Sequence, residues 1–120
     1  MNVLFLDDDT GLRSFYRHII KHIKGVGTIA FVSNCDEFKE RIVNDRFHII
    51  ICDIHMQPMS GPEILRANKD IIKSSHIVML SCSDHIYEES NTLSSEGFNM
   101  LASLQKPLVP QDLFDLIECI

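Results

Sequence analysis

Apolar runs alternate with amphipathic segments along the whole chain. The nearly continuous apolar runs predict five strands, at about residues 2–7, 27–32, 48–53, 76–81 and 100–105. The segments between these strands repeat apolar residues at helical spacing. In the first segment one helical face carries Leu12, Phe15, Tyr16, Ile19, Ile20 and Ile23. The chain is therefore predicted to alternate strand and helix from one end to the other.

Four further helices are predicted, three of them with start signals in the sequence. Asn34-x-x-Glu37 and Ser60-x-x-Glu63 are capping-box patterns that open the second and third, and Pro110 opens the fifth. The fourth is expected at about residues 85–96. The residues expected to face inward are Phe38 and Ile42; Ile64, Leu65, Ile71 and Ile72; Ile86 and Leu93; and Leu113, Phe114, Ile117 and Ile120.

Alternating strands and helices predict an α/β fold. Five parallel strands would be joined by right-handed crossovers, giving a doubly wound sheet with helices on both faces and three layers in all. Burial on both faces explains strands that are apolar throughout. With 120 residues and 45% hydrophobic content, we expect residues 1–120 to form one domain with its own core.

Polar residues of a particular kind follow four of the predicted strands. Asp7 and Asp8 follow the first, Asp53 ends the third, Ser81 ends the fourth, and Lys106 follows the fifth. Ligands of open α/β sheets bind at the carboxyl ends of the strands. Burial of an unpaired carboxylate such as Asp53 would cost many kcal/mol, so we expect a cationic partner. The pattern therefore predicts a site at this edge of the sheet.

The residue types at these strand ends suit phosphoryl chemistry. Carboxylates gathered in one crevice repel one another, and Mg²⁺, which prefers oxygen ligands, would relieve that repulsion. One carboxylate could then attack a phosphoryl group and form an acyl phosphate. A lysine ammonium and a hydroxyl would neutralise and hold the other phosphoryl oxygens, and Lys106 and Ser81 are suitable groups.

These residues give the chain a resemblance to the receiver domains of two-component response regulators, along its whole length. The matching positions are Asp7-Asp8, Asp53, Ser81, Lys106-Pro107 and the turn glycine Gly61. The resemblance implies a flavodoxin-like strand order 2-1-3-4-5. It also implies a switch rather than an enzyme: Asp53 would accept a phosphoryl group from a sensor histidine kinase or a histidine phosphotransfer protein, and a downstream effector domain or protein would respond.

The resemblance also implies roles for the neighbouring residues. Asp8, Asp53 and the backbone carbonyl of His55 would hold Mg²⁺, with Asp7 acting mainly through bound water. Ser81 would supply the switching hydroxyl and Lys106 the lysine.

The chain departs from the usual receiver pattern at three places. Gln57 stands where the family has proline, and Pro58 follows one residue later. Ser103 replaces an aromatic residue whose movement reports phosphorylation, and Asn99 and Met100 replace small residues before it. The phosphorylation chemistry is therefore better supported than its usual transmission.

Two other functions compete with the receiver. Asp7-x-Asp9-Thr10-Gly11 is similar to the signature of haloacid-dehalogenase-like phosphatases, in which Asp7 would be the nucleophile and Asp9 the acid/base. Against this, Thr10 and Gly11 stand in swapped order and Asp53 would have no task; Asp9 or Thr10 is expected to cap the first helix instead. The third reading is a degenerate receiver that binds partners without phosphorylation.

Charge and composition exclude other classes. The net charge is −6, and Lys106 is the only lysine or arginine after residue 73, so we expect no direct nucleic-acid binding. No apolar stretch approaches the ~20 residues that a membrane span needs. The four cysteines lack metal-ligand spacing and are expected to be reduced core thiols of a cytoplasmic protein. His18 and His22 have no third ligand nearby in the sequence.

Overall fold

The computed structural model of the chain describes residues 1–82, 86–106 and 108–118. The side chains of residues 86 and 87 lie outside this description, so the predicted anchors Ile86 and Ile120 are not part of it. Within the described residues, no helix is long and apolar enough to cross a membrane.

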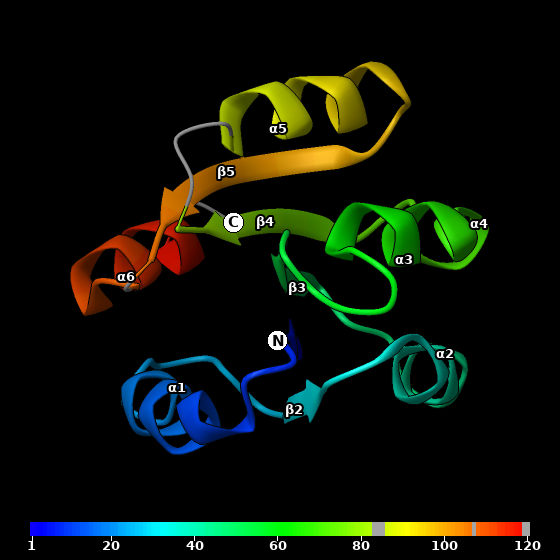
Figure 1. Cartoon of the computed structure of the whole chain (residues 1–120). Coiled ribbons are helices and arrows are strands. Elements are labelled where there is room, and N and C mark those ends of the chain that lie inside the picture. Colours follow the sequence, from blue (N-terminus) through cyan, green and yellow to red (C-terminus); the bar gives the residue numbers. More distant parts are fainter. Residues whose placement is uncertain (83–85, 107, 119–120) are drawn as a thin grey trace.

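Five parallel strands form a single sheet (Figure 1). They are β1 (Val3–Leu6), β2 (Ile29–Val32), β3 (Ile49–Asp53), β4 (His76–Ser81) and β5 (Asn99–Gln105). Their order in the sheet is β2-β1-β3-β4-β5. This is the flavodoxin-like order with its switch point between β1 and β3, so the predicted fold class is confirmed.

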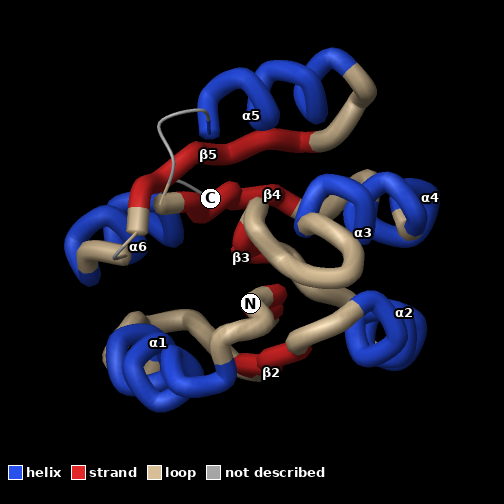
Figure 2. The backbone as a smooth tube through the Cα atoms, in the orientation of Figure 1, coloured by secondary structure: helices blue, strands red, loops and turns tan. Residues whose placement is uncertain are grey.

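Helices cover both faces of the sheet, as Figure 2 shows. The short 3₁₀ helix η1 (Thr10–Leu12) leads into α1 (Arg13–Ile20), which lies on one face with α6 (Pro110–Glu118). The other face carries α2 (Cys35–Asn44), α3 (Gly61–Ala67), α4 (Lys69–Ile72) and α5 (Ile86–Ser95). The two layers of helices and the sheet make the predicted three-layer architecture.

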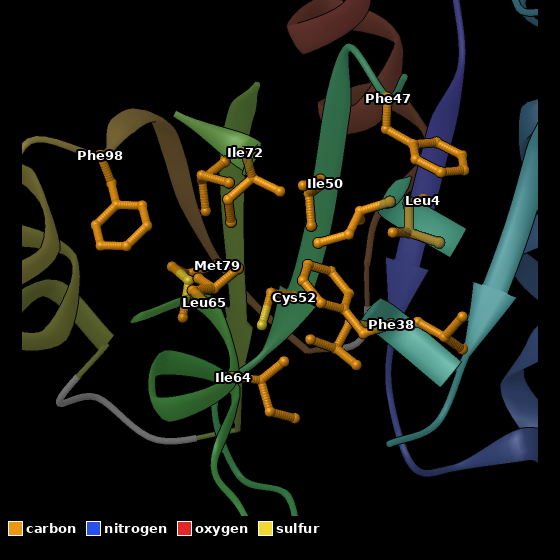
Figure 3. Close-up of a cluster of buried hydrophobic side chains, with 14 of the residues drawn as sticks. Leu4, Phe38, Phe47, Ile50, Cys52, Ile64, Leu65, Ile72, Met79 and Phe98 are labelled. Atoms are coloured by element: carbon orange, nitrogen blue, oxygen red, sulfur yellow. The ribbon is translucent and has the colours of Figure 1, made fainter. Parts of the chain in front are cut away.

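Each face of the sheet has its own hydrophobic core. Because side chains alternate along a strand, Leu4 of β1 and Ile50 of β3 point to the α2 side, where they pack near Phe38 (Figure 3). Phe5 of β1 points the other way and packs with Tyr16 of α1. Burial on both faces is the physical reason why β1 has no polar residue and why β3 has none before Asp53, its last position.

The third predicted helix is interrupted at Asn68. The buried Asn68 side chain donates a hydrogen bond to the carbonyl of Ile64 at 2.8 Å, and the residue leaves helical geometry. The segment therefore forms two helices, α3 and α4, instead of one. The break changes which side of the second piece faces the core, so Ile72 is buried but Ile71 is 52% exposed, and the prediction for Ile71 was wrong.

Three smaller features differ from the pattern-based expectations. Phe15 was predicted to face the core but is 43% exposed, because Tyr16 takes the inward position of α1. Of the cysteines, Cys52 is a core thiol, Cys35 is half-buried and Cys82 is exposed; Cys119 lies outside the described residues. In the loop after β3, the Gln57–Pro58 peptide bond is cis.

Candidate functional site

Two buried carboxylates meet at the carboxyl edge of the sheet. β1 and β3 are hydrogen-bonded neighbours with Leu6 opposite Cys52, so Asp7 and Asp53, the next residue of each chain segment, emerge side by side. Asp7 is 7% exposed and Asp53 is 5% exposed. Two carboxylates at this depth need a cation, since burial alone disfavours their charged forms.

The cation is Lys106, which follows β5. Its Nζ lies 2.9 Å from Oδ2 of Asp7 and 3.2 Å from Oδ2 of Asp53. Its backbone N–H donates a hydrogen bond to the carbonyl of Ser81 at 2.9 Å, which ties the start of the loop to the end of β4. The long lysine side chain thus reaches both acids from the end of β5, the edge strand beyond β4.

Asp8 adds a third carboxylate at the mouth of the site. One carboxylate oxygen from each of Asp7, Asp8 and Asp53 lies within 4.8 Å of the others. Asp8 is exposed, whereas the other two acids are buried. Among the described residues, this is the only group of three or more side chains that could share a metal ion. A donor set made of carboxylate oxygens fits a hard cation such as Mg²⁺.

The electrostatics show that one lysine does not balance this site. The pKa of Asp53 is raised, first by burial and then by the charge of Asp7, although Lys106 opposes the shift. Burial lowers the pKa of Lys106, but its hydrogen bond to Asp7 and the charges of both acids outweigh burial and raise it above the usual lysine range. The ammonium is therefore held firmly, while Asp53 remains a carboxylate short of positive charge.

Ser81 and His55 flank this pair of acids. Ser81 is fully buried at the end of β4, the strand next to β3, where Leu80 lies opposite Asp53. The backbone N–H of His55 donates to Oδ1 of Asp53 at 3.3 Å, and the His55 side chain is exposed. Both predicted residues therefore lie at the same edge of the sheet, and their roles in metal and phosphoryl binding stay predictions.

Asp9 has a different job from its two neighbours. Its carboxylate accepts a hydrogen bond from the N–H of Gly11 at 3.0 Å and caps η1. The prediction was that Asp9 or Thr10 caps the first helix; Asp9 does so for η1, whereas α1 itself has no side-chain cap. Its own N–H donates to Oδ1 of Asp7 at 2.9 Å, which fixes that carboxylate. Asp9 thus orients the site without entering the acid cluster.

Gly61 packs directly against the backbone of Asp53. It is the first residue of α3, and its N–H donates to the carbonyl of Ile54 at 3.0 Å. A Cβ at this position would lie 2.0 Å from the carbonyl oxygen of Asp53 and 2.6 Å from Sγ of Cys52. Only glycine fits there. The resemblance to receiver domains predicted that Gly61 lies in a turn, but it did not reveal this contact.

Tyr16 is a residue near the site that the sequence pattern placed only in the core. Its ring stacks on Phe5, with centroids 4.7 Å apart and planes 9° from parallel, and the residue is 2% exposed. Burial, followed by the charge of Asp7, raises the pKa of Tyr16 to about 12. Tyr16 follows Asp7 and Asp8 by only a few residues, which indicated that it could lie near them. The orientation of α1 is what brings its ring close enough for Asp7 to affect its pKa.

His18 of α1 and His22, in the turn that follows this helix, lie edge to face with ring centroids 5.3 Å apart. No third possible ligand joins them among the residues that the structure describes. Both histidines are exposed to solvent.

Comparisons with known proteins agree with this geometry. The family model described as "Response regulator receiver domain" matches residues 3–118. The structure of the chemotaxis protein CheY4 of Vibrio cholerae is similar, with a TM-score of 0.80 and 24% identity over 99% of this chain and 97% of that one. A two-component response regulator from Clostridium difficile has a TM-score of 0.82 and 20% identity over 99% and 93% of the two chains. At these identities the structures show the fold alone.

One sequence relative extends beyond this region. The sensory transduction protein LytR of Staphylococcus haemolyticus is 23% identical over 84 residues, which are 70% of this chain and 33% of that protein. The matched region thus spans about a third of the relative's length.

Proposed function

Because the chain belongs to the response regulator receiver domain family, we propose that it is a switch in which Asp53 accepts a phosphoryl group in a Mg²⁺-dependent reaction. Receiver domains are signalling switches rather than classical enzymes. The observation that carries the proposal is the buried Asp53 carboxylate, whose Oδ2 lies 3.2 Å from Nζ of Lys106 and which forms a three-acid cluster with Asp7 and Asp8. We extend the receiver assignment to residues 1–120 as one domain.

The acid cluster fits the metal that the proposal requires. Asp8, Asp53 and the His55 carbonyl would hold Mg²⁺, and Asp7 would act mainly through bound water. When bound, the metal supplies positive charge that Lys106 alone does not provide. The support is chemical: every donor is an oxygen, and the pKa of Asp53 is already raised by burial and by Asp7.

The chain's own residues then divide the transfer among them. A carboxylate oxygen of Asp53 attacks the phosphorus of a phosphohistidine, the P–N bond breaks, and an acyl phosphate forms on Asp53. Lys106 turns its ammonium to a phosphoryl oxygen, and the Ser81 hydroxyl binds another. Asp7, fixed by the N–H of Asp9, keeps its carboxylate in place while Lys106 moves.

The partners follow from the family. A phosphodonor kinase is implied by family membership, and we propose a sensor histidine kinase or a histidine phosphotransfer protein in the cytoplasm. A downstream effector domain or protein would read the phosphorylated state. The contacts of the described residues do not favour the phosphatase alternative. The Asp7 carboxylate accepts hydrogen bonds from Lys106 and from the N–H of Asp9, and the Asp9 carboxylate caps η1.

The direct test is the adduct itself. Purified protein incubated with Mg²⁺ and acetyl phosphate should gain the mass of one phosphoryl group. Hydroxylamine, which cleaves acyl phosphates, should remove it, and peptide mapping after borohydride reduction should place the modified residue at Asp53. An adduct on any other residue, or sustained hydrolysis of a phosphate ester, would contradict the proposal.

Mg²⁺ should stabilise the fold before any phosphorylation. A ligand that binds only the folded state raises the free energy of unfolding by RT ln(1 + [L]/Kd), so Tm should rise with Mg²⁺ concentration. The rise should be lost in Asp8→Asn and kept in Asp36→Asn, which changes an exposed acid of α2 outside the cluster. Thermal unfolding with and without EDTA measures both. A Tm that stays unchanged at millimolar Mg²⁺ would favour a degenerate receiver that binds partners without phosphorylation.

A further inference from the structure

A pocket of about 250 Å³ opens beside Lys106 and is separate from the acid cluster. It lies between the η1–α1 segment on one side and Cys82, Lys106 and Leu108 on the other. Among the residues that the structure describes, its lining consists of Leu12, Phe15, Tyr16, Cys82, Lys106 and Leu108. Four of the six are aliphatic or aromatic apart from the Tyr16 hydroxyl, so the pocket offers ring and alkyl surface directly next to a phosphoryl-binding lysine.

The Tyr16 hydroxyl is a hydrogen-bond donor without an acceptor in this wall. Tyr16 is 2% exposed, and no hydrogen bond joins its hydroxyl to any residue in the described ranges. The hydroxyl oxygen is not fully enclosed by protein, so its small exposed area opens on the pocket that Tyr16 lines. Stacking on Phe5 fixes the ring. The pocket therefore presents one fixed donor that awaits an acceptor.

The charges around the pocket select an uncharged occupant. In the metal-free site the Lys106 ammonium already pairs with Asp7 and Asp53, and together with Asp8 these acids outnumber its one positive charge, so the described lining residues offer an anion in the pocket no unshared cation. A cation would meet the Lys106 ammonium first, since Lys106 forms part of the wall. Phe15 and Tyr16 supply aromatic surface for a ring. The volume lies just below the ~300 Å³ at which pockets for drug-sized ligands begin, which suits a molecule of one ring.

We propose that this pocket binds a small uncharged molecule with one aromatic ring and a hydrogen-bond acceptor for Tyr16, and that its occupation slows phosphorylation of Asp53. The second half rests on the proposed function, because it works through Lys106, which forms one wall of the pocket and contacts Asp53. An occupant packed against the lysine stem restricts the movement of the ammonium toward a phosphoryl oxygen.

Cys82 provides a natural reporter of binding, since its exposed thiol lies in the pocket wall. The probe is dithiodipyridine, an uncharged aromatic disulfide whose ring nitrogen is an acceptor. The Cys82 thiolate attacks one sulfur, the disulfide bond breaks, a mixed disulfide forms, and pyridinethiolate leaves and takes up a proton. If the probe binds in the pocket before it reacts, the rate of Cys82 labelling should level off at high probe concentration. With hydroxyethyl disulfide, which lacks the ring, the rate of Cys82 labelling should rise in proportion to the reagent concentration and should not level off.

Two comparisons isolate the pocket from general thiol reactivity. Cys35, half-buried and outside this pocket, should show no saturation with either reagent. Tyr16→Phe keeps the ring and removes the donor, so the half-saturating concentration at Cys82 should rise about fivefold, the effect of one lost hydrogen bond. Labelling of Cys82 that never saturates, or that Tyr16→Phe leaves unchanged, overturns the binding site.

Phosphorylation is measured separately. Benzamide, an uncharged ring with a carbonyl acceptor and no reactive group, should compete with the probe and slow adduct formation from acetyl phosphate. Adduct formation without benzamide tests the proposed function independently. Competition by benzamide with an unchanged phosphorylation rate overturns the regulatory half of the inference.

Discussion

Asp53→Asn is expected to abolish the phosphoryl adduct and, at the same time, to make the metal-free protein more stable. The amide has no nucleophilic carboxylate, so acyl phosphate formation is lost outright. Stability should rise because the folded protein holds Asp53 with a raised pKa, first through burial and then through Asp7. An asparagine at this position carries no charge to desolvate, and Lys106 retains its 2.9 Å contact with Asp7.

The gain should depend on pH with a definite sign. A carboxyl group whose pKa is higher in the folded state than in the unfolded state contributes stability that is complete below the unfolded pKa and is lost as pH rises through the folded pKa. The stability advantage of Asp53→Asn should therefore be largest near neutral pH and shrink as the pH falls through the raised pKa of Asp53. Thermal unfolding in EDTA should show a rise of a few degrees in Tm at neutral pH.

Asp7→Asn is the informative comparison. Asp7 is the nearer partner of Lys106, so its loss removes the stronger of the two ion-pair contacts. This variant should lose stability at neutral pH, and its adduct should form more slowly but still on Asp53. An adduct abolished by Asp7→Asn and retained by Asp53→Asn would reverse the assignment in favour of the phosphatase reading.

Gly61→Ala is expected to cost about 3 kcal/mol or more of the free energy of unfolding, at the upper end of overpacking effects. The added Cβ would stand 2.0 Å from the Asp53 carbonyl oxygen, and backbone atoms cannot turn away as a flexible side chain can. The start of α3 or the end of β3 must shift. Since a domain of this kind is stable by only ~5–15 kcal/mol, this is a large fraction.

The matched control is Gly27→Ala. A Cβ at Gly27 would meet Oδ1 of Asn2 at 3.6 Å, an ordinary contact, so its unfolding free energy should change little. Denaturant unfolding of both variants gives the comparison. The Mg²⁺-dependent rise in Tm should also shrink in Gly61→Ala, because Asp53 moves with its backbone. Equal unfolding free energies for the two alanine variants would contradict the proposed packing.

Much of the fold was accessible from local patterns. The period of the apolar residues located all five strands, and the capping pattern at Ser60 located the start of α3. Asp9 or Thr10 was predicted to cap the helix after the first strand, and Asp9 caps η1 there. These features depend on residues only a few positions apart, which is why a sequence pattern can carry them.

Other features depended on contacts between distant segments. Whether Ile71 faced the core was decided by the buried hydrogen bond of Asn68, and a continuous helical pattern hid the break. The solvent-facing position of Phe15 likewise reflects how α1 lies against the sheet, and Cys82 is exposed just beyond the end of β4. Apolar character alone could not distinguish them from core residues.

For the site itself, the sequence by itself determined which chemical groups stand at the strand ends: Asp7, Asp8, Asp53, Ser81 and Lys106. Only the tertiary structure decided how they share charge. Lys106 is 99 positions from Asp7 along the chain, yet strand order places its ammonium between two buried acids and leaves Asp8 exposed. Strand residues carry a local periodicity that a sequence displays, whereas burial and charge pairing arise from register and crossovers that join distant segments, and these exist only in the folded chain.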